Sequence, residues 1–254
     1  MQTKEENSNQ VREFFDNHAK VYRSKYEKRD NFYDYFFYER LEKATDGLKV
    51  EGKAILDIGA GTGPLYDFLA ASGLNGFKTY EATDISAGML AQSNIPKADQ
   101  RIGDFTQMEF DDSYDLIFML GVSTYLSADQ MKDHLRKVVE ILNPGGVFIV
   151  TFTHSQSVDI FMRKLLSPIA KLFSGDDRII SQQFKTKYYS RKEIESLMAD
   201  PIQIVAIEGL NHTFFPFSRI FKKPSIRFAK QIARRKESNF KRLMSSDLLV
   251  KISR

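Results

Sequence analysis

The sequence predicts an α/β fold in which helices cover both faces of a largely parallel sheet. Short apolar runs of buried-strand length, such as 115–121 and 147–153, alternate with stretches of helical periodicity. Three glycines follow the first apolar run, where a strand would turn sharply into a helix. The chain has 254 residues, of which 42% are hydrophobic and 28% charged, and this balance is typical of one large globular domain, or of one domain with a sizeable insertion.

The expected elements follow one another along the chain. Residues 10–45 are predicted to be helical, because apolar side chains recur there at spacings of three and four and an aromatic run closes at Gly47. Strands are then expected at 53–58, at 77–86, up to 101–105, at 115–121 and at 147–153. Helices are expected between them at 64–73, 87–94 and 128–142, with a turn at 143–146.

The alternation breaks after Thr153. Residues 155–187 contain an amphipathic stretch interrupted by Pro168, and this segment is predicted to be an insertion over the open end of the sheet. The pattern resumes with a helix at 190–200 and a strand at 202–210. A basic helix or helix pair is expected at 218–242, and residues 247–254 close the chain as a strand.

Composition excludes several classes of protein. No apolar run approaches the 18 residues of a membrane-spanning helix, and the polar N-terminus lacks the apolar core of a signal peptide, so we expect a cytoplasmic protein. The chain has no cysteine, which excludes cysteine-ligated zinc, iron–sulfur clusters and a cysteine nucleophile. We expect no metal site.

Charge is unevenly distributed. Residues 210–254 hold 12 Lys and Arg against two acidic residues, whereas the rest of the chain is mildly acidic. The basic residues are interleaved with Phe, Ile and Leu, a pattern that fits a helix lying on an anionic membrane, a phosphate-binding surface or a solvated helix face. We favour a lid with an apolar inner side.

The glycine-rich turn is the strongest motif. It reads G-x-G-x-G from Gly59 to Gly63, and Pro64 stands where the dinucleotide fingerprint needs its last glycine, which disfavours NAD. No Lys-Ser or Lys-Thr follows, so the turn is not a P-loop. Asp84 and Asp104 come at the ends of the second and third strands, where ligands of open α/β sheets bind. Each could instead cap a helix, and Asp57 could either stabilise the turn or contact a ligand.

From about Lys53 to Thr153 the sequence resembles the class I S-adenosylmethionine-dependent methyltransferases. The resemblance rests on five motifs in order, AILDIGAGTG, ATDIS-AGML, GDF, YDLIFMLGVSTYL and LNPGGVFIV. It implies a Rossmann-like, doubly wound sheet of seven strands, whose last strand is antiparallel and inserted between the fifth and sixth. It also implies S-adenosylmethionine as the cofactor.

The resemblance also assigns roles to individual residues. The turn residues Gly59, Ala60, Gly61 and Gly63 would pass the methionine part of the cofactor, with Asp57 as a further candidate contact. Asp84 would hold the ribose. Ile85 and Met89 would lie beside the adenine, Asp104 and Phe105 would meet its edge, and Leu120 would line the wall near the sulfonium.

The N-terminal FFDNHAKVYRSKY is similar to the opening helix of small-molecule members of this family. In those members an aromatic residue closes over the cofactor, so Tyr22 and Tyr26 are candidates, although an aromatic stripe can also serve packing alone. The expected organisation is therefore a helical lid over 1–50 and a methyltransferase domain over 51–254, with cap insertions at about 155–187 and 211–243.

The sequence contains no recognisable pair of a catalytic base and an orienting partner, so no catalytic base can be assigned. His154 and Tyr125 are the candidate catalytic residues, because a histidine can deprotonate an acceptor hydroxyl and residues after the fourth strand face the substrate in this family. His18 and His212 are weaker candidates, and His134 is expected on a polar surface. Methyl transfer can also proceed largely by positioning of an intrinsically nucleophilic acceptor.

The sequence argues against a nucleic-acid acceptor. Residues 120–123 read Leu-Gly-Val-Ser instead of the Asp/Asn-Pro-Pro-Tyr-like motif of amino-methylating DNA and RNA enzymes. The C-terminal layout is loosely similar to magnesium-protoporphyrin O-methyltransferases. We therefore expect methylation of an oxygen or nitrogen of a small, amphipathic or lipid-linked molecule. The alternatives are an RNA or protein methyltransferase that uses the basic segment, or a non-catalytic protein that binds S-adenosylmethionine.

Overall fold

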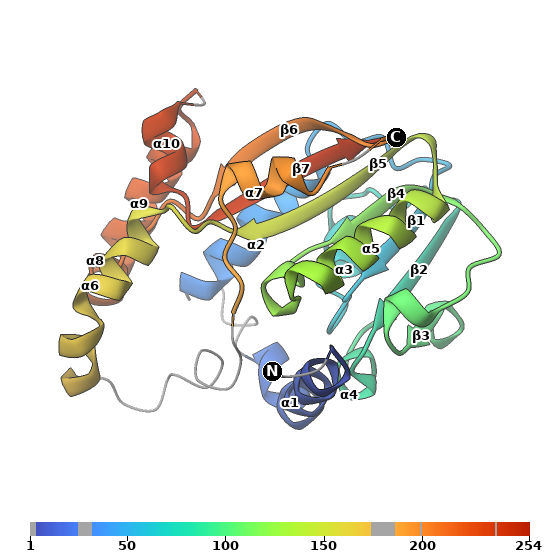
Figure 1. Ribbon diagram of the computed structural model, residues 1–254, viewed down its shortest axis with the longest axis horizontal. Helices are drawn as coiled ribbons and strands as arrows, with labels where there is room; N and C mark the ends of the chain where they lie inside the picture. The colour runs from blue at the N-terminus through green and yellow to red at the C-terminus, as the bar shows by residue number, and fades with distance from the viewer. Residues whose placement is uncertain (1–3, 25–31, 174–185, 199, 237) are drawn as a thin grey trace.

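A computed structural model describes residues 4–24, 32–173, 186–198, 200–236 and 238–254 (Figure 1). Its seven-stranded sheet has the order β3-β2-β1-β4-β5-β7-β6. The strands are β1 (Ala54–Ile58), β2 (Thr79–Asp84), β3 (Gln100–Ile102), β4 (Tyr114–Met119), β5 (Leu142–Thr153), β6 (Gln203–Leu210) and β7 (Asp247–Ser253). The first five pair in parallel, and β7 is antiparallel to both of its neighbours. The predicted doubly wound sheet, with its last strand between the fifth and sixth, is confirmed.

Helices connect the strands and cover both faces of the sheet. Among the described residues they are α1 (Lys4–Ser24), α2 (Phe32–Thr45), α3 (Pro64–Ala71), α4 (Ala87–Leu90), α5 (Ala128–Ile141), α6 (Val158–Phe173), α7 (Arg191–Ser196), α8 (Phe217–Ile220), α9 (Lys222–Ala233) and α10 (Asn239–Met244). Short 3-10 turns lie at Lys97–Asp99, Phe105–Gln107 and Ser123–Tyr125. None of the helices in this part of the chain is long and apolar enough to cross a membrane.

The sheet separates two apolar cores, as its continuous apolar strands predict. In β4, Ile117 and Met119 face the core on the side of α5 and α7, whereas Leu116 and Phe118 face the core formed with α2, α3 and α4. The same alternation runs through β1, β5 and β7. Both faces of the central strands are therefore buried, which fixes their register and the place where their carboxyl ends meet.

Two local predictions are wrong. The expected turn at 143–146 belongs to β5, whose register against β4 jumps from the pair Tyr114–Leu142 to the pair Leu116–Val147. The backbone groups of the extra residues pair with the chain end, where Gly145 N donates to Arg254 O at 3.0 Å. This partner is distant in sequence, so local turn chemistry could not reveal it. Similarly, α6 continues through Pro168 to Phe173 instead of being interrupted there.

The helices of the two C-terminal segments gather at one end of the molecule. We call α6, α8, α9 and α10 the cap helices; α6 follows β5, and α8 to α10 lie between β6 and β7. Figure 1 shows them side by side beyond the ends of these strands, while α1 lies at the lower edge next to α4. The predicted division into a lid, a domain and two insertions remains a prediction.

Candidate active site

The glycine turn after β1 is fixed by hydrogen bonds to the end of β2. The N–H groups of Gly59 and Ala60 both donate to Thr83 O, at 2.8 and 3.0 Å, and Gly61 N donates to Asp84 Oδ2 at 2.8 Å. Gly59 has a φ of +70°, and a Cβ there would lie 2.3 Å from Cγ2 of Val122. Any other residue at this position would therefore adopt a strained backbone and push the Val122 side chain aside.

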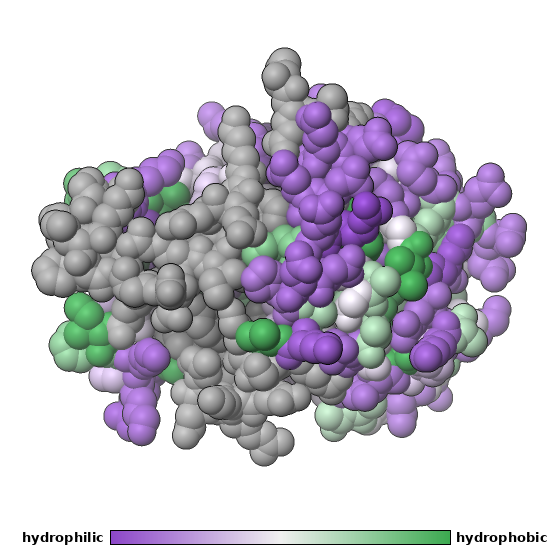
Figure 2. All heavy atoms as spheres, turned by 90° about the horizontal axis from the view of Figure 1, so that it is seen from below, coloured by the Kyte–Doolittle hydropathy of each residue, from purple (hydrophilic) through white to green (hydrophobic). Residues whose placement is uncertain are grey.

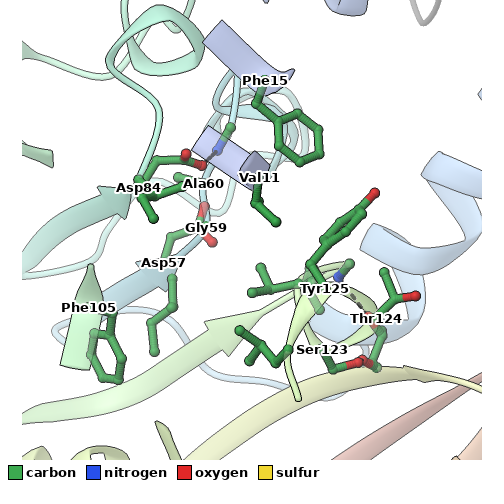
Figure 3. A pocket seen from close by; sticks show the side chains of 18 of the residues that line it. Val11, Phe15, Asp57, Gly59, Ala60, Asp84, Phe105, Ser123, Thr124 and Tyr125 are labelled. Atoms are coloured by element: carbon green, nitrogen blue, oxygen red, sulfur yellow. Dashed lines mark hydrogen bonds between the residues drawn. The ribbon is translucent and has the colours of Figure 1, made fainter. Parts of the chain in front are cut away.

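A cavity of about 340 Å³ opens beside this turn, at the edge where the parallel strands end. Its walls come from α1 and α2, from the ends of β1, β2, β4 and β5, and from the first residue of β7. Figure 3 shows Val11 and Phe15 of α1 facing the space between the glycine turn and Tyr125. The volume lies in the range of small-molecule sites.

Two carboxylates line this cavity: Asp57, which is buried, and Asp84, which is partly exposed. Asp84 accepts hydrogen bonds from Gly61 N and Ser86 N, both at 2.8 Å, yet burial outweighs them and raises its pKa to about 6. Asp57 accepts a hydrogen bond from the Tyr80 hydroxyl at 2.8 Å, and burial raises its pKa to about 7, with the Asp84 charge adding to the increase. Desolvated carboxylates of this kind favour a ligand that brings hydrogen-bond donors or positive charge.

The β3 end of the cavity is formed by Asp104, Phe105 and His134. Asp104 Oδ1 accepts hydrogen bonds from N and Oγ1 of Thr106, so this residue caps the turn Phe105–Gln107 and also lines the cavity. His134 packs against Phe105 with ring centroids 5.5 Å apart. Burial lowers the His134 pKa, and because its Nδ1 lies 2.8 Å from the carbonyl of Gln130, Nδ1 carries the proton of the neutral ring.

Helix α1 is attached on both sides of the cavity. Near its start, Asn7 Nδ2 donates to Tyr125 O at 3.0 Å and to Gln130 Oε1 at 3.2 Å. Further along, Asp16 Oδ1 accepts hydrogen bonds from Ser86 Oγ at 2.6 Å and from Gly88 N at 2.8 Å. Between these attachments, Phe15 meets Tyr125 edge to face at a centroid distance of 5.3 Å. The helix therefore roofs the cavity from α5 to α4.

Comparison with known families identifies the central part of the fold. Residues 56–148 match a family described as "Methyltransferase domain". This match agrees with the resemblance to class I methyltransferases that the sequence motifs indicate. The sequence-based recognition, the enzyme class and S-adenosylmethionine as methyl donor are thereby confirmed. No curated protein matches the chain.

Solved structures with a similar fold extend the likeness beyond this domain. Magnesium protoporphyrin IX methyltransferase from Synechocystis PCC 6803, with bound SAH, is 14% identical at a TM-score of 0.63, over 98% of this chain and 99% of that one. A possible histamine N-methyltransferase from Thermotoga maritima is 15% identical at a TM-score of 0.60, over 96% and 99%. A putative Haloferax volcanii methyltransferase, in complex with the Trm112 activator, is 19% identical at a TM-score of 0.61, over 94% and 96%.

Most of the predicted site residues line the cavity beside the glycine turn. They are Tyr22, Asp57, Gly59, Ala60, Gly61, Asp84, Ile85, Met89, Asp104, Phe105, Leu120 and Tyr125. Gly63 is not among the lining residues. It is the N-cap of α3 with a φ of +75°, and a Cβ there would lie 2.9 Å from Cβ of Ser93. A glycine at position 63 therefore allows the turn into α3 and the close packing of this turn against Ser93.

The predicted histidines lie elsewhere. His154, the candidate base, is buried but does not line the cavity; its Nδ1 lies 3.2 Å from Ser245 O, and burial lowers its pKa. His18 stacks on Phe14 at a centroid distance of 4.2 Å, and His212 is fully buried with Nδ1 3.7 Å from Glu39 Oε1. Tyr26 lies outside the described residues.

The expectation of a polar surface around His134 is wrong, since the residue is only 7% exposed and lines the cavity. It follows Met131 by three residues and precedes Val138 by four, which places it on the buried stripe of α5. Gln130 was also missed, although Ser127 and Gln130 form a capping box whose sequence pattern was visible. Phe15 also lines the cavity; it belongs to the same aromatic stripe as Tyr22, but only tyrosines are among the sequence-based candidates to cover the cofactor.

A second cavity of about 260 Å³ adjoins the first. The two share Phe37, Arg40 and Asp247, while Arg163 and Asn211 line the second alone. Arg40 lies against the end of β4, because a Cβ on Gly121 would come within 2.9 Å of its Nη1. These residues come from α2, α6 and the β6–β7 region, and no motif in the sequence links them.

Proposed function

We propose that this protein transfers a methyl group from S-adenosylmethionine to an oxygen or nitrogen of a small molecule. The observation that carries the proposal is the shape of the site: a cavity roofed by α1 and continued by a second cavity with phenylalanine walls. None of the basic residues of α9 and α10 lines either cavity. This arrangement favours a small acceptor over RNA or protein, for which a long basic groove would be expected.

The carboxylates beside the glycine turn support S-adenosylmethionine as the cofactor. When bound, S-adenosylmethionine supplies a methyl group activated by a sulfonium, together with a cationic amino group and the ribose hydroxyls. Asp84 would accept hydrogen bonds from the ribose hydroxyls, since its carboxylate lies at the end of β2 beside the glycine turn. Asp57 would add negative charge below the cationic part of the molecule.

The remaining lining residues would position the reactants and exclude water. Phe15, Tyr22 and Val11 on α1 form the roof, and Tyr125 meets Phe15 from the opposite wall. In-line displacement at an activated carbon needs close approach and alignment, which a dry and shaped cavity provides. A dedicated base is needed only for an acceptor whose lone pair is protonated.

We also propose that the cap helices contact an anionic membrane. Six of the ten exposed large hydrophobic side chains of the described residues belong to this end, namely Phe161, Leu165, Ile220, Phe221, Phe240 and Leu243, which are 48–66% exposed. Exposed cations of α9 and the turn after it accompany them: Lys222, Lys223, Arg227, Lys230, Arg234, Arg235 and Lys236. In Figure 2, where the left end carries the cap helices, hydrophobic and hydrophilic side chains lie next to each other. This combination favours the surface of an anionic bilayer.

Titration calorimetry with S-adenosylmethionine, S-adenosylhomocysteine and NAD tests the cofactor. We expect micromolar binding of the two sulfur compounds and none of NAD. Transfer of radioactive methyl to small amines and alcohols, to RNA and to protein then tests the acceptor. Label in RNA or protein alone would contradict the small-molecule proposal. Binding without transfer to any acceptor would favour a regulatory protein.

A further inference from the structure

The second cavity lies at the edge of the sheet where methyl transfer would take place. Because β7 runs antiparallel to its neighbours, its first residue, Asp247, pairs with the last residues of β5 and β6, Thr153 and Leu210. This geometry brings a carboxylate from the C-terminal strand to the edge that holds the glycine turn. Asp247 lines both cavities and stands at their junction together with Arg40.

Asn211 presents an unused acceptor in the wall of this cavity. It is 3% exposed and has a φ of +57°, a conformation that costs energy for any residue other than glycine. Three neighbours hold it there: its N–H donates to Glu39 Oε2 at 2.8 Å, its carbonyl accepts from Ser246, and its Nδ2 donates to Asp247 Oδ2. Only Oδ1 is left without a hydrogen bond.

An unsatisfied buried acceptor destabilises the protein unless a ligand supplies the missing donor. Asp247 offers a second acceptor close by. Its Oδ2 receives Arg40 Nη2 at 3.2 Å and the Asn211 amide, whereas no described residue donates to its Oδ1. Oδ1 of Asn211 and Oδ1 of Asp247 are thus two oxygens of the second cavity's wall to which no described residue donates.

The cations of the cavity wall are already neutralised. Arg40 pairs with Asp247, and Arg163 pairs with Asp159 at 2.6 Å while lying 5.6 Å from the ring of Phe215. The other walls are the rings of Phe36 and Phe37. Nε of Arg40 is a buried donor without a hydrogen-bond partner, but the charge of Arg40 is balanced by Asp247. A free anion would therefore find no unbalanced positive charge here, whereas a group with N–H or O–H donors and an apolar body would match the oxygens and rings of the wall.

We infer that the second cavity is the acceptor subsite, and that Asn211 and Asp247 bind the amine or hydroxyl group that receives the methyl group. This inference rests on the proposed function. In the transfer, the lone pair of the acceptor atom forms the new bond to the methyl carbon, the carbon–sulfur bond breaks with its electrons left on sulfur, and the acceptor proton passes to Oδ1 of Asp247. Phe36 and Phe37 hold the apolar body of the acceptor.

Three probes with one skeleton test this assignment: 2-phenylethylamine, 2-phenylethanol and 3-phenylpropionate. Their binding to the protein saturated with S-adenosylhomocysteine is measured by saturation-transfer NMR. We expect the amine and the alcohol to bind at least about tenfold more tightly than the carboxylate, the factor expected for a charge-assisted hydrogen bond. Equal binding of all three, or binding of none, would overturn the assignment.

Substitutions locate the binding. Asn211→Gly keeps the backbone conformation and removes Oδ1, so we expect about fivefold weaker binding of the amine, and Asp247→Asn should weaken it about tenfold or more. Asn75→Gly, the same change at an exposed asparagine that lines neither cavity, should leave amine binding unchanged. Thermal unfolding of each variant verifies its fold. Unchanged amine binding in both folded variants would disprove the subsite.

The two proposals fail in different ways. If S-adenosylhomocysteine does not bind the wild-type protein, the proposed function itself is wrong. If it binds and the probes do not discriminate, the cofactor site stands and only the acceptor subsite is lost.

Discussion

In the functions proposed here, the cofactor side of the molecule and the cap end would recognise their ligands by different means. Around the glycine turn, the proposed site is formed by backbone N–H groups and two carboxylates, and its geometry depends on the positive φ of Gly59 and Gly61 and on the hydrogen bond from Gly61 N to Asp84. At the cap end, exposed side chains on short helices carry the chemistry, and no single one of them is fixed by the fold. A site built from backbone leaves a motif in the sequence, whereas a surface built from side chains leaves only a composition.

The largest effect is expected at the cap end. Replacing Lys222, Lys223 and Arg227 with Gln removes three exposed cations. Each is worth about 1 kcal/mol near an anionic surface, so binding to phosphatidylserine vesicles should fall roughly 100-fold in a sedimentation assay. Binding by the wild-type protein should also fall steeply with salt.

A matched control separates this surface from net charge. Replacing the exposed Lys49, Lys132 and Lys192, which lie outside the cap helices, changes the charge by the same amount. We expect this variant to sediment nearly as well as the wild-type protein. Equal losses in the two triple variants would show that the cap helices have no special role.

The next effect concerns the cofactor side. Asp84→Ala removes both the acceptor for the ribose hydroxyls and the bonds to Gly61 N and Ser86 N that hold the turn. Calorimetry should show a loss of affinity for S-adenosylhomocysteine of roughly 10- to 100-fold, as expected for charge-assisted hydrogen bonds. Asp111→Ala, an exposed carboxylate change, serves as the control. If Asp84→Ala binds normally, Asp84 does not belong to the site.

The sequence predicts that the residues of the cofactor side lie around one cavity, because each part of this side is local. The glycine turn, Asp84 and Asp104 each follow a strand whose apolar run is visible, and parallel strands end at one edge. The contacts of Asn211 and Asp247, on which the proposed acceptor subsite rests, could not be predicted, since they depend on an antiparallel strand and on Glu39, which is 172 residues from Asn211. The burial of His134 could not be predicted for a different reason: a polar side chain is expected at the surface, although the position of His134 lies on the buried stripe of α5.

Acidification should raise the stability of the free protein and lower its affinity for the cofactor. Burial raises the pKa of Asp84 to about 6 and of Asp57 to about 7, above the ordinary 3.8, so the folded protein holds extra protons between pH 4 and 7. The stability that these groups contribute is therefore present at low pH and lost as the pH rises through 6 to 7. The free protein should unfold at a higher temperature near pH 5.5 than at pH 8.

Cofactor affinity should change the other way, because the ribose hydroxyls and the cationic groups need ionised carboxylates. Between pH 8 and 5.5 we expect affinity for S-adenosylmethionine to fall about tenfold, as protonation competes with binding. The loss should be smaller for Asp84→Asn, which has lost one titrating group. An affinity that stays constant over this range would show that neither carboxylate meets the cofactor.

The smallest effect is expected where the two kinds of recognition meet, at the attachment of α1. Asp16→Ala removes the hydrogen bonds to Ser86 Oγ and Gly88 N, which are worth about 1–2 kcal/mol in total because Asp16 is exposed. S-adenosylhomocysteine should then dissociate about fivefold faster in surface plasmon resonance, and the α1 amides should exchange hydrogen faster. Asp16→Asn keeps an acceptor oxygen and should hold the helix.

Because the charge of Asp16 contributes to the raised pKa of Asp84, both variants should move the midpoint of the pH profile of cofactor affinity to lower pH. A faster release in Asp16→Ala but not in Asp16→Asn would assign the effect to the roof of the cavity, whereas equal release rates in both would assign it to the charge.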